Sequence, residues 1–293
     1  MKITITGSLG NIGKHLSQIL IKEGHDLTVI SSNKERKAEI EKIGAKAAIG
    51  SVKDLAFLKS VFAGADAVFV MTPPNYGEQN IIQKTIEVGE TFKQAIESAG
   101  IKRVVMLSSL GADLAAGTGP IVALHQIEQN YKTLNNTFVT FLRPGYFYSN
   151  YYRDIPMIKN AGFMGSNYPA ETRIPQVHPE HIAAVAAEEL IKTGSEYSIR
   201  YIASDYISVG EATQAIGQAI GKPDLKWVEF SDEESLSGMK QAGFSNELAA
   251  LYVEMGSSMR NNLLQADFDK SGAPITGTVK INDFAKEFAT HFN

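Results

Sequence analysis

Short apolar runs and longer segments of helical periodicity alternate along the first half of the chain. The segment that follows the first run repeats apolar residues from Ile12 to Leu20 at helical spacing and stops at Gly24, and a second long helix is predicted from Glu78 to Ala99. Because parallel strands must be joined by crossovers, this alternation predicts a parallel sheet with helices on both faces. The strand-like runs are rich in Val, Ile, Phe or Leu and occupy residues 2–6, 27–30, 47–49, 67–71, 104–107 and 138–142.

The second half of the chain departs from this regular alternation. Residues 144–177 carry aromatics, glycines and prolines without a clear period, so we expect an irregular segment near a ligand site. The pattern then predicts a helix over residues 178–192, a strand over 198–203 and a helix over 209–220. From about Leu225 onward it indicates one short strand and several helices.

These elements predict an α/β protein whose main part is a doubly wound, Rossmann-type parallel sheet. We expect this domain to span residues 1–147, with residues 174–222 returning to it. Residues 148–173 and 223–293 are expected to form a smaller, discontinuous and mostly helical lobe on the substrate side.

The composition excludes several classes of function. The 293 residues are 44% hydrophobic and 20% charged, which is typical of a globular protein, and the absence of cysteine excludes disulfides, thiolate nucleophiles and Cys-ligated metals. A net charge of -4 gives no broad attraction to nucleic acid or to an anionic membrane. No apolar run has the length of a signal peptide core or a membrane span. We therefore expect a soluble, cytoplasmic protein with neither nucleic acid nor membrane as a partner.

A glycine-rich turn joins the first predicted strand to the first predicted helix. Glycines at such a place permit a tight turn and let backbone N–H groups approach a pyrophosphate at the positive end of the helix. The spacing is GxxGxxG, and the alternative is an ordinary glycine-containing turn between strand and helix. The turn predicts dinucleotide binding, with these candidate contacts: Gly7, Ser8, Gly10, Asn11, Ile12 and Gly13.

The end of the second predicted strand bears on which dinucleotide is bound. An NAD site commonly has an acidic residue there, to accept hydrogen bonds from the ribose hydroxyls. This chain has none at that point, since Asp26 precedes the strand and belongs at its other end. The alternative is that the basic side chains from Lys34 to Lys37 are only part of a solvated first turn of a helix. The pattern favours NADP(H) over NAD(H), with these candidate contacts: Ser31, Ser32, Asn33, Lys34 and Arg36.

The chain resembles the NmrA-like family of atypical short-chain dehydrogenases, including its quinone-oxidoreductase-like bacterial members. The resemblance covers most of the chain and is carried by ITGSLGNIG, SSNKERK, VFVMTPP, VVMLSSLGA, TFLRPGYFYSN and HPEHIAAVAAEEL. It implies a strand order of 3-2-1-4-5-6-7 and a cofactor that lies across the carboxyl ends of the strands.

The resemblance also assigns residues to parts of the cofactor. It places the Gly7–Gly13 turn at the pyrophosphate and Ser32–Lys34 at the adenosine 2′ end, and it puts Thr72, Pro73 and Pro74 at the wall near the nicotinamide ribose. Ser51 and Val52 correspond to the adenine edge. Family members commonly carry Arg where this chain has Ser32, and Asp where it has Ser51. The further cofactor candidates at the ends of the fifth and sixth strands are Ser108, Arg143 and Gly145.

The tyrosine–lysine pair of most short-chain dehydrogenases is missing. Tyr131 is the tyrosine between the fifth and sixth strands, and Asn135 follows it at the position where YxxxK would need a lysine. This counts against an epimerase or alcohol dehydrogenase of the usual mechanism. Reduction of a quinone needs less acid catalysis, because the hydride adduct is a delocalised anion. Binding and orientation could then supply most of the catalysis.

Three residues on the crevice side are candidates for catalysis. Ser108 ends the fifth strand and is either a hydrogen-bond donor to a carbonyl or a structural serine. His125 is either a proton relay or a partly exposed helix histidine, and quinone-reductase-like family members place a histidine nearby. Tyr146 belongs to an aromatic segment that forms either a substrate wall or a core seam between the two lobes; its other tyrosines are Tyr148, Tyr151 and Tyr152.

No metal site is expected. His178 and His181 share one helical face, but the sequence has no HExxH motif and no obvious third ligand. The sequence therefore predicts an NADP(H)-dependent oxidoreductase that transfers hydride to a quinone or similar conjugated carbonyl. The alternative is an NmrA-like redox sensor that binds NAD(P) without catalysis and contacts a regulatory partner or a second copy of itself. A sugar-nucleotide epimerase-like enzyme is the least favoured interpretation.

Overall fold

A twisted parallel sheet forms the centre of the computed structural model, which describes residues 1–74, 77, 79–194 and 196–292. Within these residues seven strands pair in the order β10-β6-β5-β4-β1-β2-β3, and every neighbouring pair is parallel. The predicted doubly wound sheet is confirmed, and so is the order implied by the resemblance, with β10 as its seventh strand. The strands are β1 (Lys2–Ile5), β2 (Asp26–Ser31), β3 (Lys46–Ile49), β4 (Ala67–Val70), β5 (Arg103–Leu107), β6 (Phe138–Pro144) and β10 (Ser198–Ile202).

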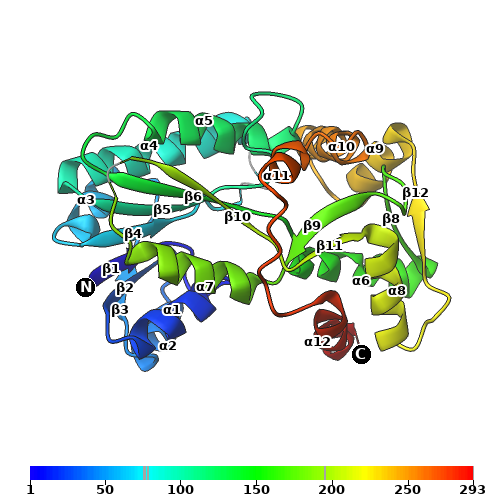
Figure 1. Cartoon of the computed structure of the whole chain (residues 1–293), viewed down its shortest axis with the longest axis horizontal. Coiled ribbons are helices and arrows are strands. Elements are labelled where there is room, and N and C mark those ends of the chain that lie inside the picture. Colours follow the sequence, from blue (N-terminus) through cyan, green and yellow to red (C-terminus); the bar gives the residue numbers. More distant parts are fainter. Residues whose placement is uncertain (75–76, 78, 195, 293) are drawn as a thin grey trace.

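Helices cover both faces of this sheet (Figure 1). One face carries α1 (Gly13–Lys22), α2 (Arg36–Lys42) and α7 (Pro179–Leu190). The other face carries α3 (Leu55–Phe62), α4 (Ile81–Ala99) and α5 (Val122–Tyr131). Glu78, where the sequence predicted the long helix to begin, lies outside the described residues. No helix in the described part of the chain combines the length and hydropathy needed to cross a membrane.

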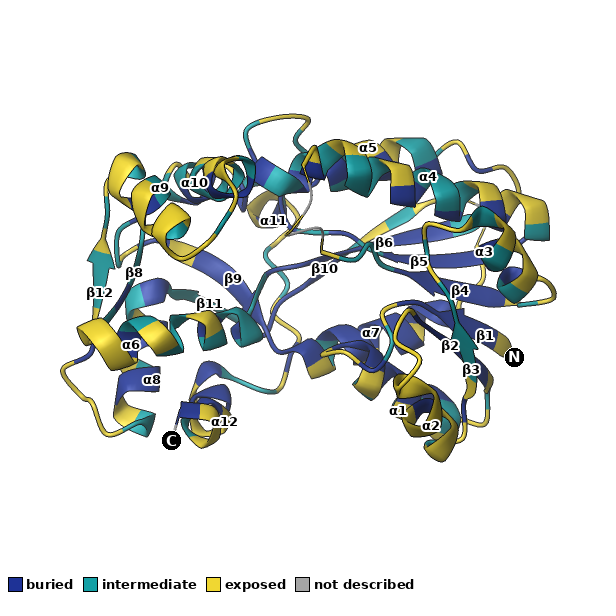
Figure 2. Ribbon diagram, turned by 180° about the vertical axis from the view of Figure 1, so that it is seen from behind, coloured by how far each residue is buried: buried dark blue, intermediate teal, exposed yellow. Residues whose placement is uncertain are grey.

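The strands divide their side chains between two hydrophobic cores, because successive residues of a strand point to opposite faces. In β4, Phe69 packs into the core beneath α1 and α7, whereas Val68 and Val70 pack into the core beneath α3, α4 and α5. Gly89 lets α4 and α5 approach closely, because a Cβ there would lie 2.5 Å from the side chain of Ile127. Figure 2 shows most strands of the central sheet as a dark, buried layer between helices whose outer faces are exposed, while the edge strand β3 is only partly buried.

The second lobe is built from segments far apart in the sequence. Two small sheets, of order β11-β9-β7 and β12-β8, form its framework in the described residues. Their strands are β7 (Tyr146–Phe147), β8 (Phe163–Ser166), β9 (Arg173–Val177), β11 (Asp205–Ser208) and β12 (Lys226–Glu229). The helices around them are η2 (Tyr148–Asp154), α6 (Ile155–Ala161), α8 (Val209–Ala219), α9 (Asp232–Gln241), α10 (Asn246–Arg260), α11 (Ala266–Lys270) and α12 (Ile281–Phe292), while η1 (Gly119–Ile121) precedes α5.

The expectation of an irregular segment over residues 144–177 was wrong. The segment contains β7, η2, α6, β8 and β9. Its strands have two to five residues, and β8 and β9 pair with β12 and β11, which come later in the chain. The strands β8 and β9 lack the continuous apolar run that marks β4 and β5, and their partners cannot be read from local sequence.

Only part of the expected return over residues 174–222 reaches the central sheet. Helix α7 packs on α1 and β5, and β10 pairs with β6. In contrast, β9 and β11 pair with each other, and α8 packs against α12 and β12. Between residues 174 and 222, α7 and β10 therefore belong to the central sheet, whereas β9 before them and β11 and α8 after them belong to the second lobe.

Candidate functional site

The predicted cofactor residues follow strands that all end at one edge of the central sheet. The turn after β1, the segments after β2 and β3, and the residues after β4, β5 and β6 share this edge because the strands are parallel. In an open α/β sheet, ligands bind in the crevice outside the carboxyl ends of the strands, where the strand order reverses. The reversal here falls between β1 and β4, beside the glycine-rich turn.

The turn after β1 has a backbone shape that depends on its glycines. Gly7 has φ +89°, and a Cβ on it would lie 2.4 Å from the sulfur of Met71. Ser8 follows with φ +54°, an uncommon conformation for a residue with a side chain. A Cβ on Gly13 would lie 2.0 Å from the carbonyl oxygen of Ser8. The turn is therefore folded tightly onto the start of α1, and this leaves the exposed Gly7 and Gly10 accessible.

Hydrogen bonds hold this turn to the neighbouring strands. The N–H of Ser8 donates to the carbonyl of Ile30 at 3.1 Å, and the N–H of Met71 donates to the hydroxyl of Thr6 at 2.8 Å. The hydroxyl of Ser8 is buried and has no hydrogen-bond partner in the described part of the chain. A glycine cradle at the positive end of α1 with a spare hydroxyl fits the diphosphate of a dinucleotide. The side chain of Ile12 is buried in the core, so only its backbone is available to a ligand.

The end of β2 presents donors rather than an acidic side chain. Ser31 is buried and accepts a hydrogen bond from the N–H of Asn33 at 3.2 Å, while residues 32–39 are exposed. The side chain of Lys34 lies in this exposed stretch, and Arg36 forms an exposed ion pair with Glu39. Asp26 starts β2 opposite Lys2, at the far end of the sheet, as the sequence predicted.

The outer candidates also lie at the strand ends. Ser51 is exposed after β3 and accepts a hydrogen bond from the N–H of Lys53 at 3.1 Å, and Val52 packs on the core beneath α3. After β4, Thr72 and Pro73 are half-buried and Pro74 is exposed. Their contacts with a cofactor stay predictions.

Ser108 and Arg143 belong to a buried charge network that sequence reasoning missed. Its centre is Glu128, a fully buried carboxylate on α5. Ser108 donates to one Glu128 oxygen at 2.6 Å, and Arg143 donates to both oxygens at 3.0 and 2.6 Å. Burial alone would lower the pKa of Arg143, but its hydrogen bonds to Glu128 outweigh this and raise it. This geometry favours the structural alternative for Ser108, and the Arg143 guanidinium is held inside the protein rather than toward a cofactor. Gly145 is buried, and a Cβ there would lie 2.2 Å from the carbonyl oxygen of Pro175.

The network extends to the second lobe. Arg143 also donates to the Tyr201 hydroxyl at 3.0 Å and pairs with Asp267 of α11 at 3.2 Å, and the Tyr201 hydroxyl donates to the same carboxylate. Neither Glu128 nor Asp267 belongs to a motif, so no sequence signal indicated this network.

The remaining catalytic candidates are placed differently. The Nδ1 of His125 is 2.9 Å from the carbonyl oxygen of Ala112 and must donate to it, so Nε2 is the acceptor in the neutral ring. Tyr146 is half-buried with its ring 5.2 Å from that of Tyr151, and burial raises the pKa of its hydroxyl well above the ordinary value. Tyr131 is a core residue whose hydroxyl donates to the carbonyl of Gly89 at 3.0 Å.

A family model shows how this fold and turn relate to known proteins. The model of the NmrA-like family matches residues 1–265. The chain belongs to the NmrA-like family. An NAD(P)H azoreductase of Xenophilus azovorans is 24% identical over 256 residues, which are 86% of this chain and 85% of the azoreductase.

Solved structures share the NmrA-like fold along nearly the whole chain. An NADPH-dependent quinone oxidoreductase of Escherichia coli, complexed with NADPH, superposes with a TM-score of 0.75 at 19% identity and covers 99% of this chain and 100% of its own. A triphenylmethane reductase of Citrobacter sp., complexed with NADP(H), reaches a TM-score of 0.82 at 19% identity, with coverage of 98% and 100%.

Most of the aromatic segment of this NmrA-like chain is a core seam. Tyr148 and Tyr151 are fully buried, and their hydroxyls donate to Asp205 at 2.5 Å and to Gln176 at 3.0 Å. Tyr152 stacks on Phe288 of α12 with ring centroids 5.6 Å apart. These three tyrosines therefore build the second lobe, and Tyr146 is left as the candidate for a substrate wall.

Asp154 is a further titratable group that the motifs did not indicate. It ends η2 and is half-buried. Burial raises the pKa of its carboxyl to about 7, although the charge of Arg153 opposes the shift. The charge of this carboxylate also contributes to the raised pKa of Tyr146, for which burial is the main cause.

His178, which caps the start of α7, and His181 in its first turn contact different partners. His178 accepts from the N–H of Glu180 at its Nδ1, so its Nε2 donates to Glu287 of α12 at 3.1 Å. The Nε2 of His181 lies 2.9 Å from the hydroxyl of Thr276.

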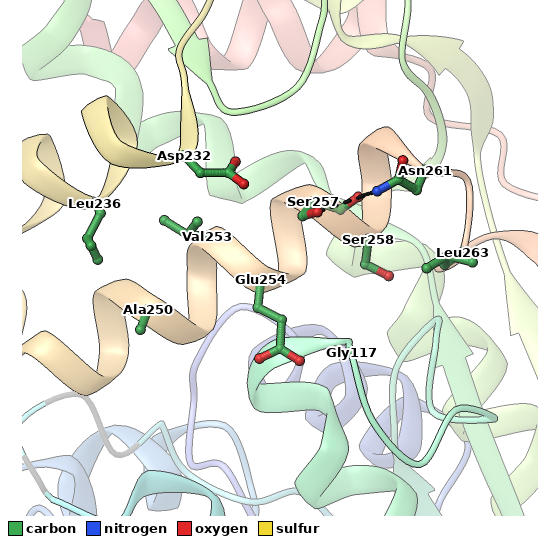
Figure 3. A pocket seen from close by; sticks show the side chains of 10 residues that line it. All are labelled: Gly117, Asp232, Leu236, Ala250, Val253, Glu254, Ser257, Ser258, Asn261 and Leu263. Atoms are coloured by element: carbon green, nitrogen blue, oxygen red, sulfur yellow. Dashed lines mark hydrogen bonds between the residues drawn. The ribbon is translucent and has the colours of Figure 1, made fainter.

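Two cavities lie in the second lobe or at its border. A small one of about 80 Å³ lies between the start of α1 and α12, lined by Asn11, Ser149 and Glu287 among others. The larger, of about 450 Å³, lies between α9, α10 and the loop at Gly117 (Figure 3). Neither of these two is lined by Thr72, Ser108 or Gly145.

Proposed function

We propose that this protein is an NADPH-dependent oxidoreductase that reduces a quinone or a similar conjugated carbonyl compound. The observation that carries the proposal is the glycine cradle of the Gly7–Gly13 turn, which lies at the point where the strand order reverses. Its fit to a diphosphate is supported by the exposed backbone of Gly7 and Gly10 and by the unpartnered hydroxyl of Ser8.

The cofactor would lie along the carboxyl edge of the sheet. The turn would hold the diphosphate, Thr72–Pro74 would form a wall at the nicotinamide end, and Ser51 and Val52 would lie at the adenine edge. Ser32, Asn33 and Lys34 are exposed donors at the end of β2, and this supports a preference for NADPH over NADH. The exposed pair between Arg36 and Glu39 is weak enough for a phosphate to compete for Arg36.

The reaction would depend mainly on binding and orientation. When bound, the reduced nicotinamide supplies the hydride. Tyr131 cannot serve as the acid of a short-chain dehydrogenase because its hydroxyl is buried and occupied by Gly89. Tyr146 and His125 stay the candidates to hydrogen-bond the acceptor, and the raised pKa of Tyr146 keeps its hydroxyl protonated at neutral pH. An acceptor whose reduced form is a delocalised anion suits a site with so little acid chemistry.

The relatives support an oxidoreductase. The matched proteins include an NAD(P)H azoreductase, an NADPH-dependent quinone oxidoreductase and a triphenylmethane reductase, and each of these names describes reduction of an extended conjugated system.

A titration of NADPH and NADH with and without menadione tests the proposal. We expect oxidation of NADPH, followed at the absorbance of the reduced nicotinamide, to depend on menadione and to be faster than oxidation of NADH. Lys34→Ala should raise the KM for NADPH and leave that for NADH unchanged, because it removes a donor to the 2′-phosphate. Failure of NADPH to reduce any of a panel of benzoquinones and naphthoquinones would refute the reductase.

The second candidate is a redox sensor that binds NAD(P) and contacts a regulatory protein. It is favoured by one observation: the larger of the two cavities described above is not lined by the strand-end residues. Tight binding of NADPH without turnover of any acceptor would support the sensor over the reductase.

A further inference from the structure

The larger cavity is a groove on α10, away from the residues assigned to the nucleotide. Its lining includes Ala250, Val253, Glu254, Ser257 and Ser258 of α10, which share one helical face by their spacing, and Asn261, which caps the end of the helix. Leu236 of α9 and Gly117 form its two sides (Figure 3). No residue of the Gly7–Gly13 turn and none of the other strand-end candidates lines it.

The opposite face of α10 is buried in the protein. Leu248, Ala249 and Met259 are core residues there, and a Cβ on Gly256 would lie 1.9 Å from the side-chain oxygen of Asn167. The groove therefore opens on the outer side of the helix. Its volume of about 450 Å³ lies within the range of small-molecule sites, which is about 300–1,000 Å³.

The groove has one uncompensated charge. Asp232 is neutralised by Arg260 at 3.0 Å and also accepts a hydrogen bond from Asn167 at 2.8 Å. Glu254 is exposed, and no described residue forms an ion pair or hydrogen bond with its carboxylate. In Figure 3 its side chain extends from α10 toward the loop at Gly117.

A second, independent feature is a buried hydroxyl without a partner. Ser258 is 2% exposed and lines the groove, yet its Oγ has no hydrogen-bond partner among the described residues. Its neighbours Ser257 and Asn261 bond to each other and leave it unsatisfied. A buried hydroxyl without a hydrogen bond is destabilising, because it has lost its water partners. A ligand atom that reaches the Ser258 hydroxyl therefore forms a hydrogen bond without first having to displace water from it.

The remaining walls are apolar. Leu236, Ala250 and Val253 line one end of the groove, and Leu263, which is 49% exposed, lines the other. We propose that this groove is a second ligand site, which takes a small organic cation: a protonated amine on an aromatic or aliphatic body. The ammonium pairs with Glu254, the body lies on Leu236, Val253 and Leu263, and the Ser258 hydroxyl receives a polar atom of the ligand.

Binding of a matched series of compounds to the full-length protein tests the charge. The probes are 4-phenylbutylamine, 4-phenylbutanol and 4-phenylbutyrate, which share one body and carry a positive, a neutral and a negative head. Calorimetric titration should give the tightest binding for the amine, weaker binding for the alcohol and the weakest for the carboxylate. Equal affinities, or preference for the carboxylate, would overturn the proposal.

Variants locate the binding. Glu254→Gln should weaken amine binding about two- to fivefold, as expected for one exposed ion pair, and should leave the alcohol unaffected. Glu233→Gln is the matched control, because this exposed glutamate on α9 does not line the groove. Amine binding that is equally weakened by both variants would mean a diffuse surface effect and would refute the site.

Ser258→Ala separates a ligand role from a structural one. Removal of an unsatisfied buried hydroxyl should raise the melting temperature of the free protein, while the affinity for the amine series falls. A lower melting temperature would mean that the hydroxyl is already satisfied in the free protein, and unchanged affinity would exclude it from the site. Titrations in the presence of saturating NADPH should give the same affinities, and competition between NADPH and the amine would overturn the placement of this groove outside the nucleotide site.

Discussion

Single residues with no spare room fix the shape of the nucleotide turn. Gly7 needs its positive φ, and at Gly13 an added methyl group would meet a backbone carbonyl. A backbone atom cannot move aside as the end of a flexible side chain can. The whole turn would therefore have to shift, and with it the N–H groups that we propose to face a diphosphate.

We expect Gly13→Ala to weaken NADPH binding more than about tenfold, which corresponds to about 1.4 kcal/mol. The physical reason is the 2.0 Å approach of the new Cβ to the carbonyl oxygen of Ser8. Fluorescence titration of the nucleotide measures this loss. Gly238→Ala in α9 is the control: apart from the adjacent backbone of its own helix, no atom would lie within 4 Å of the added Cβ. NADPH affinity should therefore stay unchanged while stability rises by about 0.5–1 kcal/mol. Normal affinity in Gly13→Ala would place the diphosphate elsewhere.

A second prediction at this scale concerns Asp154. Burial raises the pKa of its carboxyl to about 7 in the folded chain, against an ordinary value of 3.8. Between about pH 4 and 7 the folded protein therefore holds a proton that the unfolded chain has lost, so the free energy of unfolding falls as pH rises through this window. The slope from this group is at most about 1.4 kcal/mol per pH unit. Urea unfolding from pH 4 to 8 should show a flatter profile for Asp154→Asn, and parallel profiles would contradict the shift.

At the scale of elements, helix ends tie the two lobes together. Helix α4 of the central sheet begins at a left-handed Asn80, which makes no capping hydrogen bond with its own side chain. The cap comes instead from Glu247 in the first turn of α10, whose carboxylate accepts from the N–H groups of Asn80 at 2.8 Å and Ile81 at 2.7 Å. The acidic group also lies at the positive end of the α4 dipole.

We expect Glu247→Ala to lower the free energy of unfolding by about 1 kcal/mol, the usual effect of losing a helix cap. Hydrogen exchange should locate the loss at the first turn of α4, although the substitution is in α10. Glu247→Gln keeps one acceptor oxygen and should lose less. Faster exchange confined to α10 would mean that the contact does not cap α4.

At the scale of the whole molecule, one buried network joins the sheet to the second lobe. Glu128 receives hydrogen bonds from the ends of β5 and β6, and Arg143 extends the network through Tyr201 to Asp267 of α11. The side chains of Glu128 and Arg143 are 0% and 3% exposed, so each charge depends on the other for compensation.

We expect Glu128→Gln to lower the free energy of unfolding by about 3–5 kcal/mol, because it leaves the Arg143 guanidinium buried without its counter-charge. The double variant with Arg143→Met should recover part of this loss. Glu188→Gln, which breaks an exposed pair with Lys192, is the control and should change stability by at most about 1 kcal/mol. Urea unfolding measures all three, and a loss in Glu128→Gln no larger than in the control would contradict the network.

The sequence by itself determined the central sheet and the nucleotide turn. Residues such as Phe69 and Val70 belong to runs that are apolar on both faces, and Gly7 and Gly13 stand where only glycine fits, so local composition carries the signal. It also showed that Tyr131 has no lysine partner.

Only the tertiary structure decided how the strands of the second lobe pair and which partners the buried and capping carboxylates have. The strands β8 and β9 pair with segments 63 and 29–35 residues later, Glu128 meets Arg143 across two elements, and Glu247 caps a helix 166 residues earlier in the chain. These contacts depend on how secondary-structure elements pack in the tertiary structure. A single glutamate on a helix gives no local sequence signal of its partner. For the same reason the sequence could not show whether Tyr148 and Tyr151 form a substrate wall or a core seam. Their burial in the second lobe depends on contacts with segments that come later in the chain.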